Sequence, residues 1–177
     1  MQGKTVVITG GTSGIGEIAT QRLAQMGARI VLIARSKARG RVALARLNER
    51  SRGLAYTVHY ADLTRISEMK RVAAEIASQE PRIDVLINNA GAIFASRRLT
   101  EDGLECTFAL NHMAYFVITE GLREQLLASA PARIVGNITA SLLQGGISGR
   151  QKCGRGRIAQ MGQESAHGQP GQDWGSI

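Results

Sequence analysis

Short aliphatic runs alternate with longer segments of helical periodicity along most of the chain. The aliphatic runs predict strands at 6–9, 29–34, 54–60 and 83–87, and a fifth strand that begins at Arg133. The periodic segments between them predict helices at 14–26, at 36–50 and at 103–129, and one more that begins near Thr64 or Ser67 and ends before Pro81. Repeated strand–helix–strand units favour right-handed crossovers, so we expect an α/β fold with a parallel sheet and helices on both faces.

The helical segments also carry signals for their buried faces and their ends. The helix after the first strand has Ile18, Leu23 and Met26 on one side, and the helix before Pro81 has an apolar face of Met69, Val72, Ala73 and Ile76. Gly27 is expected to end the first helix, and Ser36 to cap the next one. Thr64 or Ser67 is expected to cap the helix before Pro81, and the segment at 103–129 is expected to form one long helix.

The pattern changes after Ser141. Residues 142–177 are rich in glycine and glutamine, and their few apolar residues show neither a helical nor an alternating period. We therefore expect one folded domain over residues 1–141, a disordered tail over 142–177, and a sheet that is incomplete after its fifth strand. So abrupt a change suggests a shifted reading frame or an alternative terminal exon. An unpaired strand edge would make such a protein marginally stable or dependent on a partner.

Composition narrows the class of protein. No apolar run approaches the roughly 18 residues that a membrane span needs, and the first strand begins near Lys4, which leaves no room for a signal peptide. Cys106 and Cys153 are too few for a disulfide framework, which favours reduced thiols and a cytoplasmic protein.

The formal net charge of +8 raises the question of nucleic-acid binding. Much of the positive charge lies between Arg35 and Arg52, where Glu49 is the only acidic residue. No aromatic residues interleave with these cations, as they would in a protein that binds single strands. The segment is therefore interpreted as a solvated helix face, or more narrowly as a phosphate-binding group at the start of that helix, and nucleic acid is not expected as a partner.

The first strand runs directly into a glycine-rich turn, Thr9 to Gly16, with the spacing G-x3-G-x-G. Gly10 permits a tight exit from the strand, and Gly14 allows the backbone to approach a pyrophosphate because it has no Cβ. Gly16 lets the following helix pack close to the sheet. A strand, a turn and a helix in this order present backbone N–H groups to a phosphate.

Several motifs in sequence order resemble the short-chain dehydrogenase/reductase family. Thr9 to Gly16 resembles the family's TGxxxGIG turn, and Asp62 resembles the acid that follows its third strand. Asn88 to Gly91 matches its NNAG motif, and Leu110-Asn111-His112 resembles its catalytic-Asn segment. The stretches at 100–103 and 111–113 look most like the retinol-dehydrogenase-like branch. The resemblance covers roughly residues 1 to 135 and implies a Rossmann-type, doubly wound parallel sheet that binds a dinucleotide.

The resemblance implies a cofactor site at the carboxyl ends of the strands. The implied residues are Thr9, Gly10, Thr12, Ser13, Gly14, Ile15, Gly16, Asp62, Leu63, Asn88, Asn89, Ala90 and Gly91. Two of them have a structural alternative, since Asn88 could equally hold strands together and Asp62 could cap a helix or form an Asx turn.

The end of the second strand bears on the choice of cofactor. An NAD site has an acidic side chain there, which binds the ribose hydroxyls. This chain has Ala34-Arg35-Ser36-Lys37 instead, and the planar guanidinium of Arg35 can pair with a 2′-phosphate. The sequence therefore favours NADP(H) over NAD(H). The alternative is that Arg35 lies at the start of a helix and does not bind the cofactor.

The family mechanism transfers a hydride between nicotinamide and an alcohol or carbonyl carbon, with a Tyr as general acid/base and a Lys four residues later. Here the tyrosines are Tyr56, Tyr60 and Tyr115, and none has a Lys four residues on. Asn111 matches the catalytic Asn, and Ser141 is the candidate for the catalytic Ser, with Thr139 second.

Two functions follow from these observations. One is an NADP(H)-dependent oxidoreductase acting on a small alcohol or carbonyl compound. The other is a catalytically inactive, truncated relative that binds the cofactor and forms an oligomer, with itself or with an intact member of the family.

Overall fold

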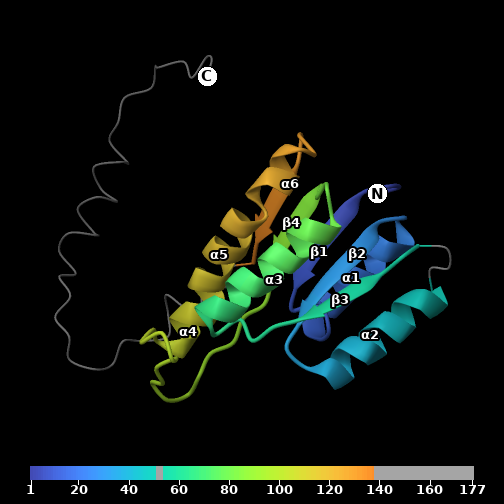
Figure 1. The fold of residues 1–177 in the computed structure, drawn as a ribbon. Helices are drawn as coiled ribbons and strands as arrows, with labels where there is room; N and C mark the ends of the chain where they lie inside the picture. The colour runs from blue at the N-terminus through green and yellow to red at the C-terminus, as the bar shows by residue number, and fades with distance from the viewer. Residues whose placement is uncertain (51–53, 138–177) are drawn as a thin grey trace, which may run out of the picture. The chain divides into compact units, whose positions relative to one another are not determined.

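The computed structural model describes residues 1–50 and 54–137, which form a five-stranded sheet in the order β3-β2-β1-β4-β5 (Figure 1). The strands are β1 (Thr5–Thr9), β2 (Arg29–Ala34), β3 (Thr57–Tyr60), β4 (Val85–Asn88) and β5 (Arg133–Gly136). All four neighbouring pairs are parallel. The predicted doubly wound, Rossmann-type α/β fold is confirmed. The predicted tail at 142–177 lies outside the described residues.

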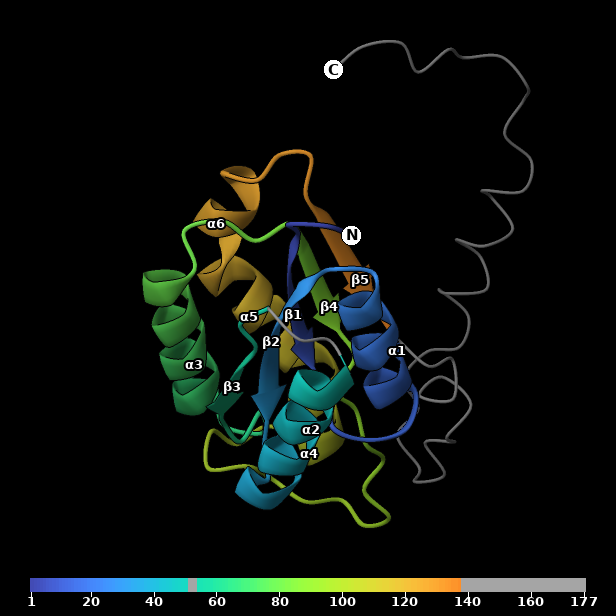
Figure 2. The same ribbon diagram turned by 90° about the vertical axis from the view of Figure 1, so that its right-hand side faces the viewer.

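Helices cover both faces of the sheet (Figure 2). In chain order they are α1 (Gly14–Gln25), α2 (Lys37–Arg50), α3 (Ile66–Gln79), α4 (Cys106–Phe108), the π-helical turn η1 (Ala109–Met113), α5 (Ala114–Gly121) and α6 (Arg123–Leu127). Helices α1 and α2 pack on one face, and α3 and α5 pack on the other. No helix among the described residues is long and apolar enough to cross a membrane.

The internal strand β2 has an apolar sequence without a break because it is covered on both faces. Ile30 and Leu32 belong to the core beneath α1 and α2, whereas Val31 and Ile33 belong to the core beneath α3 and α5. All four side chains are fully buried, because consecutive residues of a strand point to opposite faces and both faces are covered here.

The predicted buried face is correct for α3 and wrong for α1. Met69, Val72, Ala73 and Ile76 of α3 are all buried. In α1 the buried residues are Gly16, Thr20 and Ala24; of the predicted face, Leu23 is half-buried against the core, whereas Ile18 and Met26 are exposed. Small residues are selected because α1 lies close to the sheet, as a Cβ added at Gly16 would come within 2.4 Å of the Gly10 carbonyl oxygen. Helical periodicity alone does not report that distance.

The single helix expected at 103–129 is also wrong, because it is divided into four parts. Glu105 begins α4 by accepting a hydrogen bond from the Phe108 N–H at 2.9 Å. The π-helical turn follows, and it holds Asn111. Helix α5 then ends where Leu122 leaves the helical conformation, with φ −110° and ψ 11°. Local changes in helical winding therefore reorient the side chains along this segment.

Helix ends follow the sequence where the cap is local. Ser36 accepts a hydrogen bond from the Arg39 N–H at 3.3 Å, as predicted. Gly27 ends α1 with φ 87°, and the Gly27 and Ala28 amides donate to carbonyls of the last turn. The predicted caps of α3 are wrong, since Arg65 stands at the N-cap without a side-chain bond. Instead, the Ile66 N–H donates to the Asp102 carboxylate at 2.9 Å, from a loop distant in sequence.

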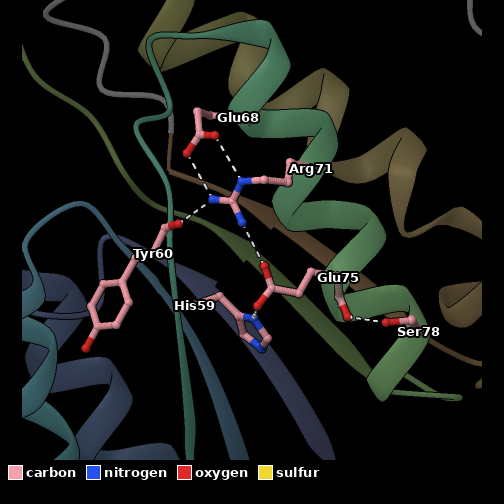
Figure 3. Close-up of polar contacts among 6 residues, drawn as sticks. All are labelled: His59, Tyr60, Glu68, Arg71, Glu75 and Ser78. Atoms are coloured by element: carbon pink, nitrogen blue, oxygen red, sulfur yellow. Dashed lines mark hydrogen bonds and ion pairs between the residues drawn. The ribbon is translucent and has the colours of Figure 1, made fainter.

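The outer edge strand β3 carries a charged network that runs onto α3 (Figure 3). The Arg71 guanidinium donates to both oxygens of Glu68 at 2.9 Å, to Glu75 at 2.8 Å and to the Tyr60 carbonyl at 2.6 Å. The other oxygen of Glu75 lies 2.9 Å from Nδ1 of the buried His59. The network therefore ties a backbone carbonyl of the edge strand to the neighbouring helix.

Candidate functional site

The carboxyl ends of β1 and β4 lie next to each other at the centre of the sheet. From β1 the chain continues to β2 and β3 on one side, whereas from β4 it continues to β5 on the other. Parallel sheets bind ligands at such a reversal of strand order, because the loops that leave the two strands separate there. The residues that follow β1 and β4 are therefore the natural place for a site.

The glycine turn between β1 and α1 is packed tightly on one side and open on the other. Gly10 has φ 69°, and a Cβ there would lie 2.8 Å from the Cα of Ala90. A Cβ on Gly16 would lie 2.4 Å from the side-chain amide nitrogen of Asn89. Gly14 also has a positive φ, 55°, but a Cβ there would meet nothing within 4 Å. The turn thus presses against the end of β4 through Gly10 and Gly16 and presents Gly14 outward.

Helix α1 begins within this open part of the turn. Ser13 stands at its N-cap and makes no side-chain capping bond. Ser13, Gly14 and Ile15 are exposed, and Thr12 is half-buried. The first N–H groups of a helix have no acceptor within the helix and carry partial positive charge, which suits an anion. This turn therefore has the form of a phosphate-binding site.

Thr9 joins β1 to β4 through its side chain. The Thr9 hydroxyl accepts hydrogen bonds from the N–H groups of Asn89, at 3.0 Å, and Ala90, at 2.9 Å. Thr9 is only 1% exposed, so water could not readily replace its hydroxyl as the acceptor for these two N–H groups. Its hydroxyl therefore sets the path of the chain where it leaves β4.

Asn89 is the centre of the polar contacts at this edge. Its amide nitrogen donates to the carbonyls of Thr9 and Gly10, each at 3.2 Å, and its oxygen accepts from the Asn137 amide at 3.1 Å. Sequence reasoning missed Asn137. Its position directly after the fifth strand, equivalent to that of Asn89 after β4, is the signal that could have found it.

Asn88 and Asp62 make the structural contacts that the sequence left open as alternatives to cofactor binding. Asn88 is 2% exposed and donates to the Thr119 hydroxyl at 3.1 Å, which ties β4 to α5. The Asp62 carboxylate accepts from the Thr64 N–H at 3.0 Å and from its hydroxyl at 2.8 Å, which forms an Asx turn. The Leu63 side chain is buried in the core, so only its backbone can face a ligand. Cofactor contacts for all three stay predictions.

Asn111 fastens the loop that follows β4. Its oxygen accepts from the Ala92 N–H at 3.1 Å, while its nitrogen donates to the Ala92 and Thr107 carbonyls at 2.7 and 2.8 Å. A Cβ on Gly91 would lie 2.5 Å from the Asn111 oxygen, so Gly91 allows this close approach. The structure brings Asn111 beside the Ala90–Gly91 segment, and its catalytic role stays a prediction.

Arg35 lies at the carboxyl end of β2, on the same edge of the sheet. It is exposed and forms no ion pair or hydrogen bond with any residue that the structure describes. An unpaired guanidinium at this position remains available to bind an anion.

The catalytic acid/base is the part of the site that the described residues do not supply. The Tyr115 hydroxyl donates to the Ala90 carbonyl at 3.0 Å and lies 3.3 Å from the Asn137 carbonyl oxygen. Burial raises the pKa of Tyr115, which opposes acid/base work near neutrality. Ser141 and Thr139 lie outside the described residues. Within residues 1–50 and 54–137, no group of three or more His, Cys, Asp or Glu side chains could hold a metal ion.

Curated proteins similar to this chain include human retinol dehydrogenase 14, 37% identical over 148 residues, and human retinol dehydrogenase 13, 36% identical over 133 residues. These alignments cover 76% and 75% of this chain but only 44% and 40% of the relatives. A putative daunorubicin C-13 ketoreductase, DnrU of a Streptomyces species, is 38% identical over 82% of this chain and 52% of its own length. The chain thus spans about half, or less, of these relatives.

Solved structures share the fold. A short-chain dehydrogenase from Sphingobium yanoikuyae in complex with NADPH is 34% identical, with a TM-score of 0.65 over 75% of this chain and 52% of its own. The NADH-dependent reductase A1-R′ complexed with NAD is 28% identical, with a TM-score of 0.68 over 82% of this chain and 63% of its own. A sequence model described as short chain dehydrogenase matches residues 4–147. The chain therefore belongs to the short-chain dehydrogenase/reductase family, in its retinol-dehydrogenase-like branch.

Proposed function

We propose that this chain binds NADP(H) at the carboxyl edge of its sheet and forms the cofactor-binding part of an oxidoreductase that acts on a small alcohol or carbonyl compound. The observation that carries the proposal is the glycine turn, which Asn89 ties to β4 while Gly14 and the start of α1 stay open. When bound, the dinucleotide would supply or accept a hydride. The proposed dinucleotide-binding domain spans residues 1–141.

Each residue group has a proposed task toward the dinucleotide. The turn from Thr9 to Gly16 would hold the pyrophosphate through backbone N–H groups at the start of α1. Asp62 and Leu63 would border the adenine ring, and Asn88 to Gly91 would border the ribose. Asn111 would orient the loop at Ala92 and take part in proton transfer, and Ser141 would orient the substrate oxygen.

The preference for NADP(H) rests on Arg35. Similar structures include complexes with NADP or NADPH, among them the RhlG complex from Pseudomonas aeruginosa, but also a complex with NAD. The cofactor type therefore has to come from this chain's own residues. The exposed, unpaired guanidinium at the end of β2 favours a cofactor that carries an additional phosphate.

Substitution of Arg35 tests this preference. Arg35→Ala should raise the dissociation constant of NADPH about tenfold and leave that of NADH unchanged, because a charge-assisted hydrogen bond contributes about 1.5–3 kcal/mol. Arg41→Ala is the matched control, since Arg41 is an exposed cation farther along α2. Equal or tighter binding of NADH by the unmodified protein would exclude the preference.

A second candidate function is cofactor binding without turnover, alone or in an oligomer with an intact relative. It is favoured by one observation, the lack of a Tyr with a Lys four residues later anywhere in the sequence. General acid–base catalysis contributes roughly 10²–10⁴-fold to rate. NADPH oxidation with a panel of aldehydes and ketones distinguishes the two, because binding without turnover supports the second candidate only. The cytoplasmic location stays a prediction.

A further inference from the structure

We propose that Asn137 is a positioning residue for the dinucleotide turn, acting from β5 through Asn89. This inference rests on the proposed function, because it assigns a role to Asn137 in shaping the same turn. Asn137 itself contacts neither the turn nor α1 through any hydrogen bond of the described residues. Its effect on a bound dinucleotide would therefore be indirect.

Asn89 can hold the turn in only one orientation. Its side-chain nitrogen donates to both the Thr9 carbonyl and the Gly10 carbonyl, each at 3.2 Å. If the amide were reversed, its oxygen would face these two carbonyl oxygens, and both bonds would be replaced by repulsion. The same nitrogen is the atom that a Cβ on Gly16 would meet at 2.4 Å. The amide of Asn89 therefore separates the start of the turn from the start of α1.

Asn137 supplies the donor that matches this orientation. Its side-chain nitrogen lies 3.1 Å from the Asn89 oxygen. A donor at that oxygen favours the observed orientation over the reversed one, and it polarises the amide so that its nitrogen donates more strongly. The turn is thereby linked through Asn89 to the end of β5.

The backbone of Asn137 is fixed from two sides. Its N–H donates to the Asn88 carbonyl at 2.9 Å, which continues the ladder between β4 and β5. Its carbonyl oxygen lies 3.3 Å from the Tyr115 hydroxyl of α5. Because strand pairing and α5 hold the backbone, the side chain can act as a rigid donor. The position of β5 beside β4 is thus transmitted to a turn that follows β1 (Figure 1).

The test compares Asn137→Leu with Gln125→Leu in the full chain. Leucine is close to asparagine in size but donates no hydrogen bond, so Asn89 loses its partner. Gln125→Leu removes a side-chain amide that donates to the Ala77 carbonyl at 3.3 Å, between α6 and α3. Both variants lose one hydrogen bond from an amide side chain, and only the first affects Asn89. Asn137→Gln keeps an amide donor and serves as the conservative variant.

The first measurement is a titration with NADPH at a temperature where circular dichroism shows each variant folded. Asn137→Leu should raise the dissociation constant about tenfold, Asn137→Gln should recover part of this loss, and Gln125→Leu should change it by less than about twofold. Unchanged affinity in Asn137→Leu, or an equal loss in Gln125→Leu, would overturn the inference. A wild-type chain that binds neither NADPH nor NADH would overturn the proposed function instead.

The second measurement needs no cofactor. The Gly10 N–H donates to the Ile33 carbonyl, and the Asn89 and Ala90 N–H groups donate to the Thr9 hydroxyl, so all three amides should resist hydrogen exchange. Asn137→Leu should speed their exchange about tenfold relative to the amides of α3, and Gln125→Leu should not. Equal protection in Asn137→Leu and wild type would contradict the inference even if the cofactor binds.

Discussion

Two polar networks lie at different edges of the same sheet, and only one of them has the form of a binding site. The network at the ends of β1, β4 and β5 is neutral and consists of Thr9, Asn89 and Asn137. The network on β3 and α3 is charged and consists of His59, Glu68, Arg71 and Glu75 (Figure 3). The neutral network holds backbone groups of a turn whose outer side stays open, whereas the charged groups of the other network pair with one another.

The charged network also has the shifted pKa values that often mark functional sites. The bidentate hydrogen bond from Arg71 lowers the pKa of Glu68, and the same bond raises the pKa of Arg71. Yet every charged group in it has a partner within the network, and Arg71 also binds an edge carbonyl. Strong charges and shifted pKa values therefore mark structural closure at β3, and open backbone donors mark the candidate site at β1.

The largest expected effect comes from adding a methyl group to the neutral network at Gly10. Gly10→Ala combines a left-handed conformation, φ 69°, with a Cβ only 2.8 Å from the Ala90 Cα. We expect a loss of roughly 3 kcal/mol or more in the free energy of unfolding, together with a loss of cofactor binding. Urea denaturation and NADPH titration measure the two effects.

Gly103→Ala is the matched control for this substitution. Gly103 has φ 74°, but a Cβ there would meet nothing within 4 Å. Only the conformational cost of about 1 kcal/mol should remain, with cofactor affinity unchanged. Equal losses for the two variants would mean that the contact between the turn and β4 contributes nothing beyond backbone strain.

A smaller effect is expected when the Thr9 hydroxyl is removed without a change of shape. Thr9→Val leaves the Asn89 and Ala90 N–H groups without their acceptor at a position that is 1% exposed. We expect a loss of about 2 kcal/mol in the free energy of unfolding, measured by urea denaturation. Thr9→Ser keeps the hydroxyl and should retain most of the stability, whereas a loss as large as that of Thr9→Val would assign the effect to the methyl group.

The smallest effect is expected in the charged network. Arg71→Met should lower the midpoint of thermal unfolding by no more than about 4 °C, because exposed ion pairs contribute little. The affinity for NADPH should not change, because Arg71 lies at the outer strand. A clear loss of affinity would show that the two networks are coupled.

The same variant should change the response to acid. In the folded protein the pKa of Glu68 lies below its ordinary value of 4.5, so its contribution to stability is present above that value and is lost as pH falls through the folded pKa. Arg71→Met removes the largest cause of the shift. The difference in unfolding midpoint between about pH 7 and about pH 3.5 should therefore be smaller than in the wild type, and an unchanged difference would count against this cause.

Features that depend on neighbouring residues could be predicted from the sequence. The strands follow from short apolar runs or, for β3, from alternating apolar and polar residues, and the caps at Ser36 and Gly27 depend on side chains or conformations within one turn of the helix. The buried face of α3 follows from its helical period. In each case the residues that decide the structure are close together in sequence.

Features that depend on distant elements could not be predicted in this way. The buried face of α1 is made of small residues because the helix lies close to the sheet, and that distance is set by the turn and by Asn89. The N–H of Ile66 is capped by Asp102, 36 residues later. The break between α5 and α6 at Leu122 directly follows Gly121, but the sequence does not show that this glycine lies against α3, where a Cβ on it would come within 2.6 Å of the Ala73 Cβ.

The sequence by itself determined the succession of strands and helices along the chain, the glycine turn after β1 and the family. Each of these depends on residue types in short segments. Only the tertiary structure decided which polar groups work together at the turn. Thr9 meets Asn89 across 80 residues, and Asn89 meets Asn137 across 48. These contacts exist because the strand order places β1, β4 and β5 side by side, and sequence spacing carries no measure of that adjacency.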